Sequence, residues 1–486
     1  MRPERFTAWI LATALCAAAP AVQGAPDAAT RTSAATALSL QDARTRLLQV
    51  SDQLAAARAA VESKRLQTQG LQGLGGPIVG LSASHTRYSL HGELDLAEAK
   101  QEIGNRLSEL GPLLPALGPL AQPVGQLATR LPQAIPDALP YHLKGTRNSQ
   151  AISAVWPVYT GGATQAVKDF SAAQQDEAQA DAQATTHQLE DTLVQRYFGV
   201  QLARRAVALR QQAASTIAEH DHAAERLLQV GMIARVDRLQ ASVALEQARR
   251  EQLKAQGDLA LAQAALQSLL HSEQAVQPST PLFVDTRPLP PLEQFRQLAL
   301  GHHPGLDKVA AKKAQAEQLH ALENSRWKPT VALFGRRELQ RNNASWVAGV
   351  QAHWTLWSSV DRHSMQQAAA QKIIQAERTD AQVRSDIALL VEKNWRAVDD
   401  ARQQYLSLTP SVQLAQEMMR LRSSGLREGT STMIDLIDAH TQYTKVETER
   451  AKAAHDYVLA LSRLLDSAGV PEQFDQYAQR ADVRLR

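Results

Sequence analysis

The chain has 486 residues, and its formal net charge of +3 at pH 7 is too even to indicate a nucleic-acid partner or a strongly acidic one. Its one cysteine, Cys16, argues against a fold held together by disulfides. With 21% charged and 5% aromatic residues, and long stretches of alanine, glutamine, leucine, arginine and glutamate, the composition favours long helices packed by small side chains over a large globular core.

Residues 1–24 are typical of a secretory signal peptide. Arg2 and Arg5 form a basic start, residues 6–19 form a short apolar run, and small residues precede Ala25. The run is shorter than the ~18–20 residues that a membrane helix needs. Since Cys16 lies within this segment, we expect a mature chain without cysteine, which fits a bacterial envelope.

The rest of the chain contains an internal duplication. An offset of 198 residues superimposes the pairs Trp156 and Trp354, Gly231 and Gly429, and Asp237 and Asp435. Upstream, Pro77 aligns with Pro329 at a larger offset, so the first copy carries an insertion of about 54 residues. We therefore expect two like modules packed side by side. The predicted segments are a first repeat (25–272) with an insertion at about 90–144, a Pro-rich linker (273–291), a second repeat (292–470) and a tail (471–486).

Each module is predicted to open with an amphipathic helix, Leu40–Gln69 and Leu292–Arg326, which a proline then ends. The period next changes from 3.6 to 2, which predicts about four strands of about ten residues per chain, apolar on one face and mixed on the other. The apolar positions are Val79, Leu81 and Ala83; Ile152, Ala154, Trp156 and Val158; Val331 and Leu333; and Ala348, Val350, Ala352, Trp354 and Leu356. This length and pattern are typical of transmembrane β-strands, although a hairpin on a soluble protein remains the alternative.

Very long helices are predicted after the strands. Residues 161–228 contain no proline, and about 67 residues at ~1.5 Å each give a helix of about 100 Å. The returning helix, Arg235–Leu270, is only about 54 Å long, but the opening helix of the next module adds about 52 Å. One long helix is thus expected beside two shorter ones stacked end to end, with residues 278–291 at mid-height. Because four strands cannot close a barrel in lipid, the chain is expected to oligomerise.

Three motifs resemble those of the TolC family of outer-membrane efflux channels, which also show the tandem duplication. They are WPVYTGG at residues 156–162, GLREGTSTMIDLIDA at 425–439 and AKAAHDYVLALSRLL at 451–465. The resemblance implies a mostly α fold with a transmembrane β-barrel, in which each chain supplies four strands and long coiled-coil helices to a homotrimeric channel-tunnel. It also implies a place in the bacterial outer membrane and its lipid, and partners in a periplasmic adaptor protein and an inner-membrane pump. Such channels export drugs, metals or polypeptides, with no cofactor.

The resemblance maps the acidic rings of the family's periplasmic gate onto Asp435 and Asp438. The two residues share a helix face near its N-terminus, where carboxylates are favoured. Three copies would place six carboxylates around a narrow opening, which should attract cations and raise some of their pKa values. Alternatively, Thr432 and Asp435 form a capping box in which Asp435 only closes the start of the helix, a role that Asp438 does not share.

Asp237 occupies the equivalent place in the first copy. In the family this position can pair with a tyrosine and an arginine of the second turn, but this chain has Leu426 and Ser431 there. Arg235 or Arg427 is a candidate substitute, although exposed pairs contribute little stability. We therefore expect a gate that is held closed more weakly, or by other contacts than in the family.

Glycines mark the turns of each module. Gly231 and Gly429 are interpreted as turn glycines rather than ligand contacts. The surface that family members offer to the adaptor maps onto Val230, Gly231, Met232, Gly429 and Thr430. Gly161 and Gly162 are expected to let the chain swing from strand to helix, although Ser358 and Ser359 stand at the matching positions.

The insertion departs from the family pattern. Residues 93–110 are predicted to form a short amphipathic helix, followed by a Pro-rich stretch that contains Pro112 and Pro140. A lid or contact loop outside the cell and a mobile loop are both compatible with this composition.

The sequence shows no catalytic constellation, phosphate-binding loop or nucleophile motif, so no enzyme activity is expected. The 14 histidines are scattered; His302, His303 and His222 are predicted on helix faces without a third ligand at metal spacing, so no metal site is expected. A rival function is a periplasmic coiled-coil adaptor or structural tether, which would carry a single hairpin rather than two repeats with their own strand pairs.

Overall fold

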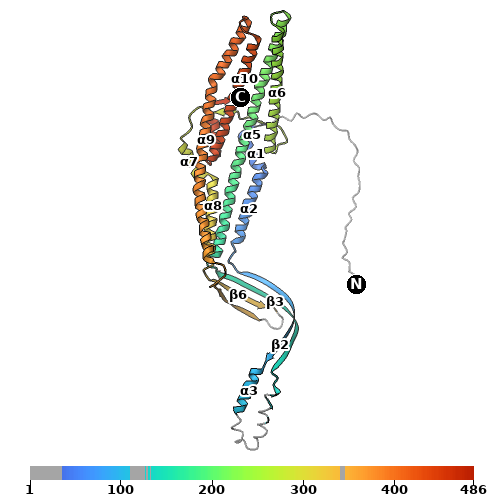
Figure 1. Ribbon diagram of the computed structural model, residues 1–486, viewed down its shortest axis with the longest axis vertical. Helices are drawn as coiled ribbons and strands as arrows, with labels where there is room; N and C mark the ends of the chain where they lie inside the picture. Colours follow the sequence, from blue (N-terminus) through green and yellow to red (C-terminus); the bar gives the residue numbers. More distant parts are fainter. Residues whose placement is uncertain (1–35, 110–125, 127–129, 132, 340–344, 486) are drawn as a thin grey trace, which may run out of the picture.

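The computed structural model describes residues 36–109, 126, 130–131, 133–339 and 345–485. The expected signal peptide and most of the Pro-rich part of the insertion lie outside these residues. The molecule is elongated: long helices occupy one half, an antiparallel sheet follows, and a narrow strand pair continues from the sheet to a short helix, α3 (Ala97–Glu109) (Figure 1).

Two helical hairpins run the length of the helical half. The first joins α5 (Ala163–Gln229, 67 residues) to α6 (Arg235–Leu269), and the second joins α9 (Arg362–Arg427, 66 residues) to α10 (Met433–Ser467). The predicted lengths are confirmed. Near the hairpin turns the helices form a row in the order α6, α5, α10, α9, since α5 packs against α6 and α10, and α10 packs against α9.

The opening helix of each module is broken, which corrects the prediction of two continuous helices. The first module has α1 (Leu40–Val50) and α2 (Asp52–Leu71), because the Ser51 hydroxyl caps a new helix by accepting from the Leu54 N–H at 3.3 Å. The second has α7 (Leu292–His302) and α8 (Pro304–Ser325). Pro304 holds His303 extended, and Nδ1 of His303 accepts from the Gly305 N–H at 3.0 Å, so His303 caps a helix instead of lying on a helix face.

The main core lies at mid-height, where the stacked helices meet. Short strands surround it: β1 (Thr36–Leu38) pairs with β4 (Val276–Pro278), and β5 (Leu282–Val284) pairs with β8 (Val483–Leu485). A 3-10 turn, Pro471–Gln473, and α11 (Phe474–Arg480) complete it. Its fully buried aromatic side chains are Tyr197, Phe198, Phe283, Phe295 and Tyr457. The segment between the repeats therefore contributes strands to this core.

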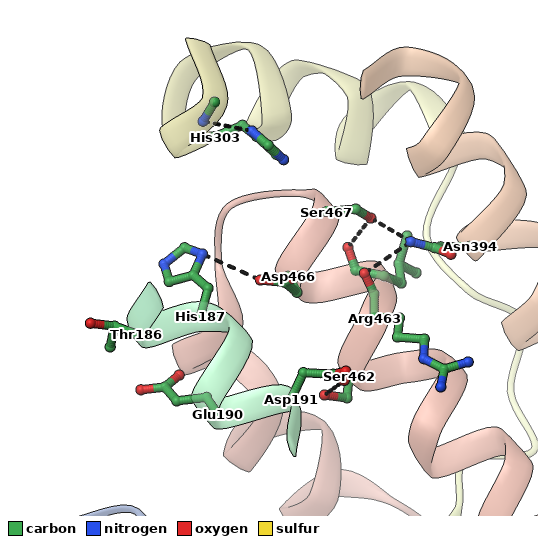
Figure 2. Close-up of polar contacts among 12 residues, drawn as sticks. Thr186, His187, Glu190, Asp191, His303, Asn394, Ser462, Arg463, Asp466 and Ser467 are labelled. Atoms are coloured by element: carbon green, nitrogen blue, oxygen red, sulfur yellow. Dashed lines mark hydrogen bonds and ion pairs between the residues drawn. The ribbon is translucent and has the colours of Figure 1, made fainter. Parts of the chain in front are cut away.

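Polar contacts at the same height tie the long helices to α10 (Figure 2). His187 Nδ1 of α5 lies 3.3 Å from Asp466 Oδ1, and the Ser462 hydroxyl donates to Asp191 at 3.1 Å. From α9, the Asn394 amide donates to the Ser467 hydroxyl at 3.0 Å. Both long helices are thus fixed to the same element.

The sheet has the strand order β2, β3, β6, β7 and is antiparallel throughout. β6 (Thr330–Glu338) and β7 (Trp346–His353) have about the expected length. The expectation of ten residues is wrong for β2 (Ile78–Asp95, 18 residues) and β3 (Ala138–Tyr159, 22 residues). Beyond the reach of β6 they continue as a two-stranded ribbon up to α3 (Ala97–Glu109), which forms within the predicted helical stretch.

Cross-strand contacts explain why the ribbon continues. His85 Nδ1 and Asn148 Oδ1 lie 2.5 Å apart. The Tyr88 ring covers Gly145, and the Tyr141 ring covers Gly92, so each aromatic side chain shields the backbone of a glycine on the other strand. Residues that the sequence assigned to the insertion therefore belong to a paired structure.

The apolar residues change faces along this strand pair. Directly paired residues share a face. Within the four-stranded sheet one face carries Val79, Leu81, Ile152, Ala154, Trp156, Leu333 and Val350. Along the ribbon that face continues with His85, Arg87, His91, His142, Lys144 and Asn148, and the opposite face carries Tyr88, Leu90, Leu94, Leu139, Tyr141 and Leu143. The sequence pattern is thus out of phase between the two parts.

Tyr197 joins three segments of the mid-height core. Its hydroxyl donates to the Leu38 carbonyl at 2.8 Å and accepts from the Ser279 and Thr280 N–H groups at 3.0 and 2.9 Å. We predict that Tyr197→Phe lowers the free energy of unfolding by about 1–2 kcal/mol, because the partly buried Thr280 N–H loses its partner. The Ser279 N–H and the Leu38 carbonyl still bond to each other at 3.0 Å. Thermal unfolding measures this loss. Tyr159→Phe, whose ring is 46% exposed, is the matched control and should be neutral; equal melting temperatures for both variants would contradict the prediction.

Candidate functional site at the hairpin tips

The turns of the two hairpins lie at the same end of the molecule, opposite the sheet (Figure 1). Each ends its long helix with a glycine in the left-handed region, Gly231 at φ 76° and Gly429 at φ 75°. The Met232 N–H donates to the Leu227 carbonyl at 2.8 Å, and the Thr430 N–H makes the equivalent bond to the Gly425 carbonyl at 2.8 Å. These are Schellman caps, so the interpretation of both residues as turn glycines is confirmed.

Asp435 caps the start of α10, as the sequence suggested. Its carboxylate accepts from the Thr432 N–H at 2.9 Å and from the Thr432 hydroxyl at 2.8 Å, and its own N–H donates to that hydroxyl at 3.1 Å. These hydrogen bonds, with a smaller effect of Arg422 at 3.8 Å, hold the pKa of Asp435 below its usual range. Within one chain, the pKa of Asp435 is therefore lowered. The rise expected from clustered carboxylates would require the acidic residues of other copies nearby.

Asp438 lies one turn further along α10 and is exposed. Within the described chain no hydrogen bond or ion pair is recorded for its carboxylate, in contrast to Asp435. Asp237, in the first copy, accepts only from the Ala234 N–H at 3.1 Å, since Ala234 has no side-chain acceptor to complete a capping box. The three candidate gate residues therefore differ in the number of hydrogen bonds that their carboxylates accept.

A cleft of about 630 Å³ separates the two turns. It is lined by Met232 and Asp237 on one side and by Leu426, Gly429 and Ser431 on the other. The structure thus brings Asp237 together with the two positions that carry the tyrosine and arginine in the family.

Neither substitute for that lock is formed. Among the ion pairs of the described chain none joins Asp237 to Arg235 or Arg427, and Arg427 instead donates to the Ser424 hydroxyl at 3.1 Å. Within one chain, therefore, neither candidate arginine pairs with Asp237.

An apolar cluster joins the hairpins instead. Ala224 and Ala241 of the first hairpin and Met433 and Ile437 of the second are all buried against one another. Leu426, which replaces the family's polar residue, packs against the same cluster. Sequence reasoning missed this contact because its members come from distant helices and are individually ordinary core residues.

Charges behind the first turn are also paired within their own hairpin. Arg238 of α6 donates to Asp221 of α5 at 2.6 Å and also binds Glu225. The hydrogen bond from Arg238 holds the pKa of Glu225 below its usual range. Asp221 and Arg238 thus join the two helices of the first hairpin.

Two histidines meet between the hairpins just behind the apolar cluster. The ring centroids of His220 (α5) and His440 (α10) lie 5.3 Å apart with their planes at 50°. Burial lowers the pKa of both, with an opposing effect of Glu219 on His220 and a further lowering of His440 by His220. Both imidazoles are therefore neutral at neutral pH. No motif around either histidine predicted this contact.

The strand-to-helix junctions differ between the modules. Gly161 and Gly162 have φ angles of 67° and 98°, and a Cβ on Gly161 would lie 2.8 Å from the Ser325 carbonyl oxygen, so glycine is required there. In the second module Asp361 caps α9, and Arg362 donates to the carbonyls of nearby residues instead.

The duplicated tryptophans make one shared contact. The Trp156 indole N–H donates to the Gly75 carbonyl at 3.0 Å, and the Trp354 indole makes the same kind of bond to the Trp327 carbonyl at 3.1 Å. Each ties a strand end to the loop before the preceding strand, which explains why both copies carry tryptophan.

The family model for outer membrane efflux proteins matches residues 142–271 and 295–470, which include both hairpins and most of the second module. The chain belongs to the outer membrane efflux protein family. Its place is therefore the bacterial outer membrane, with the helices extending into the periplasm. In the described part of the chain, no helix combines the length and apolarity needed to cross a bilayer.

Solved structures share the fold. A membrane protein from Pseudomonas aeruginosa superimposes with a TM-score of 0.72 over 89% of this chain and 90% of its own, at 15% identity. The CmeC outer membrane channel of Campylobacter jejuni gives 0.71 over 91% of this chain and 90% of its own, at 14% identity. The expected channel-tunnel protomer, mostly α with one four-stranded sheet, is thus confirmed.

Protein CyaE of Bordetella pertussis is a curated relative. It is 30% identical over 217 residues, which are 42% of this chain and 44% of CyaE. The chain thus matches less than half the length of this relative.

The histidine contact predicts a pH dependence. Because burial lowers both histidine pKa values, the unfolded chain binds more protons than the folded one as the pH falls below about 6.5. Stability should therefore be complete above that pH and decrease toward the folded pKa values. We expect the apparent melting temperature to fall less between pH 7 and pH 5 in the His220→Gln/His440→Gln variant than in the original protein.

His303 and His455, whose pKa values burial also lowers, leave some slope in every variant. The exposed His222→Gln variant is the control and should keep the full slope. Parallel pH profiles for all three proteins would show that the pair does not titrate against folding.

Proposed function

We propose that the protein is a passive export channel, built from three copies that form a barrel in the outer membrane and a helical tunnel through the periplasm. The main support is one feature of the chain: an open four-stranded sheet with an exposed apolar face continues into helices about 100 Å long. The edge strands β2 and β7 have free backbone groups that lipid cannot satisfy. Three copies supply twelve strands and pair every edge.

The outer helices of the row support the same assembly. Near the tips, α6 and α9 are the ends of the row within one chain. Both carry exposed aliphatic side chains: Val236, Leu239 and Val243 on α6, and Leu406, Leu414 and Leu421 on α9. In a closed ring, α6 of one copy faces α9 of the next, so these side chains become buried.

In this proposal a periplasmic adaptor docks on the tip turns, at Val230, Gly231, Met232, Gly429 and Thr430. The exposure of Val230 (69%) and Met232 (73%) supports this, since such large apolar side chains are available to a partner. An inner-membrane pump selects the cargo and drives transport, and Asp237, Asp435 and Asp438 line the gate. We propose no enzymatic step and no cofactor.

The rival function, a periplasmic adaptor or tether, is disfavoured by the two strand pairs. Their combined sheet exposes Val79, Leu81 and Val350 at 69%, 73% and 66%, and a soluble protein would have to leave this apolar face in water.

We predict that the full protein is recovered with outer membranes and forms pores in planar lipid bilayers. Single-channel recording of the purified protein measures this directly. Recovery in the soluble periplasmic fraction, with no conductance at any protein concentration, would instead favour the tether.

The acidic residues of α10 should set the cation preference of the pore. We expect Asp438→Asn to lower the cation-to-anion permeability ratio, because it removes three exposed carboxylates from the gate. Asp435→Asn should do the same and should also weaken the start of α10, since the Asp435 carboxylate closes the capping box with Thr432. Reversal potentials in a salt gradient measure the ratio, and melting curves measure the cap.

The matched control is Asp258→Asn, an exposed carboxylate on α6 far from the tip. A permeability ratio that is the same in Asp438→Asn, Asp258→Asn and the original protein would remove Asp438 from the gate.

A further inference from the structure

The contact between His220 and His440 has features that the gate does not explain. It joins the two repeats: His220 lies on α5 nine residues before its last residue, Gln229, and His440 lies on α10 seven residues after its first, Met433. Both rings sit in the seam between the hairpins, directly behind the apolar cluster of Ala224, Ala241, Met433 and Ile437.

One nitrogen of the pair is buried without a partner. Nε2 of His220 is shielded from solvent and makes no hydrogen bond within the described chain. An imidazole nitrogen in that position is costly unless something binds it. Asp221 lies next to His220 in the chain, but its carboxylate binds Arg238, which also binds Glu225. These charged groups are therefore paired with one another.

The separation of the rings matches that of two imidazole ligands of one ion. Zinc lies about 2.0–2.1 Å from imidazole nitrogens, and two such ligands at a tetrahedral angle place their ring centres roughly 5 Å apart. The observed separation is 5.3 Å, with the planes inclined rather than stacked. Neutral imidazole is the form that binds metal, and burial keeps both rings in that form at neutral pH.

We propose that His220 and His440 form a binding site for a divalent transition-metal ion of the Zn²⁺, Ni²⁺ or Cu²⁺ type, which links the first hairpin to the second. Imidazole nitrogen favours these ions over Mg²⁺ and Ca²⁺, which prefer oxygen ligands. In the described chain no group of three or more His, Cys, Asp or Glu side chains is placed to hold a metal. The histidine pair thus supplies two ligands and water supplies the others, which makes binding reversible.

The charged groups around the pair support a cation there. Glu219 stands next to His220 on α5 and favours positive charge at that ring. On the other side, a groove between α9 and α10 places Glu417 and Arg420 near His440. These two form their own ion pair at 2.6 Å, so they add little net charge. The site depends on the fold of one chain and not on the export function proposed above.

The site has a defined consequence if the protein is a channel. A metal bound to both repeats stabilises the conformation in which the hairpins touch, because it binds this state more tightly than a separated one. This part alone rests on the proposed function. In this chain, an exchangeable metal ion would then take the role of the polar lock that is missing between the two hairpin turns.

The test is metal titration of the purified full-length protein, prepared with a tag that contains no histidine and stripped with EDTA. Calorimetry and melting curves are recorded with ZnCl₂, NiCl₂ and, as a comparison, MgCl₂. We expect one Zn²⁺ or Ni²⁺ per chain and a higher melting temperature, with no response to Mg²⁺. In His220→Gln and in His440→Gln, the metal should no longer raise the melting temperature. The affinity for the metal should fall at least tenfold in each variant.

Two control variants make the result specific. His222→Gln changes an exposed histidine of the same helix and should keep full binding. His91→Gln disrupts the other histidine pair, on the ribbon, where the His91 and His142 centroids lie 3.9 Å apart. Loss of binding in His91→Gln with retention in His440→Gln would place the metal on the ribbon and overturn the proposal.

A further measurement separates ligation from misfolding. Melting in EDTA shows whether His440→Gln still folds, and binding repeated at pH 5.5 should be weaker because protons compete for the imidazoles. An equal metal response in all variants, or none in the original protein, would also overturn the site. Because neither readout requires a pore, a channel that conducts but binds no metal refutes this inference alone.

Discussion

The unpaired edges of the four-stranded sheet are the constraint on which the rest of the structure depends. β2 and β7 lie at the edges of an antiparallel sheet whose apolar face suits lipid, and lipid offers backbone groups no hydrogen bonds. A single chain cannot meet that demand, so the sheet makes sense only as part of a closed barrel. The helices must then repeat around the same axis, and the duplication lets each chain supply two similar hairpins to that ring.

Features governed by local chemistry were predictable from the sequence. The absence of proline predicted α5, whereas α9 continues through Pro410. Single glycines predicted the turns at Gly231 and Gly429, because a left-handed residue after a helix is a local requirement. The Asp435 cap followed from Thr432 three residues earlier. Each of these depends on residues within one or two turns of one another.

Features governed by distant contacts were not predictable. The pairing of His220 with His440 joins residues far apart in the chain, and nothing near either histidine marks it. The breaks at Ser51 and His303 are local exceptions, because a neighbouring capping side chain, and Pro304 in the second case, decides the backbone there. They were missed because the apolar periodicity runs through them. The ribbon was missed because its apolar residues shift to the other face, which removes the single alternating pattern that a strand search follows.

That shift of faces also bears on how deep the sheet would lie in a bilayer, because the side chains on one face change from aliphatic to polar along the strands. On the apolar face of the sheet, the aliphatic side chains of Leu81 and Ile152 are followed by Ala83 and Gln150, two residues further from the helices along each strand, and then by His85 and Asn148. A strand advances about 3.4 Å per residue, so residues on one face are about 7 Å apart. A shift of the barrel by that distance toward the helices would move the His85 imidazole and the Asn148 amide into hydrocarbon. Raising it would strand valine and leucine in water. In the proposed barrel, this change from aliphatic to polar side chains along the strand pair would fix the level of the protein in the membrane.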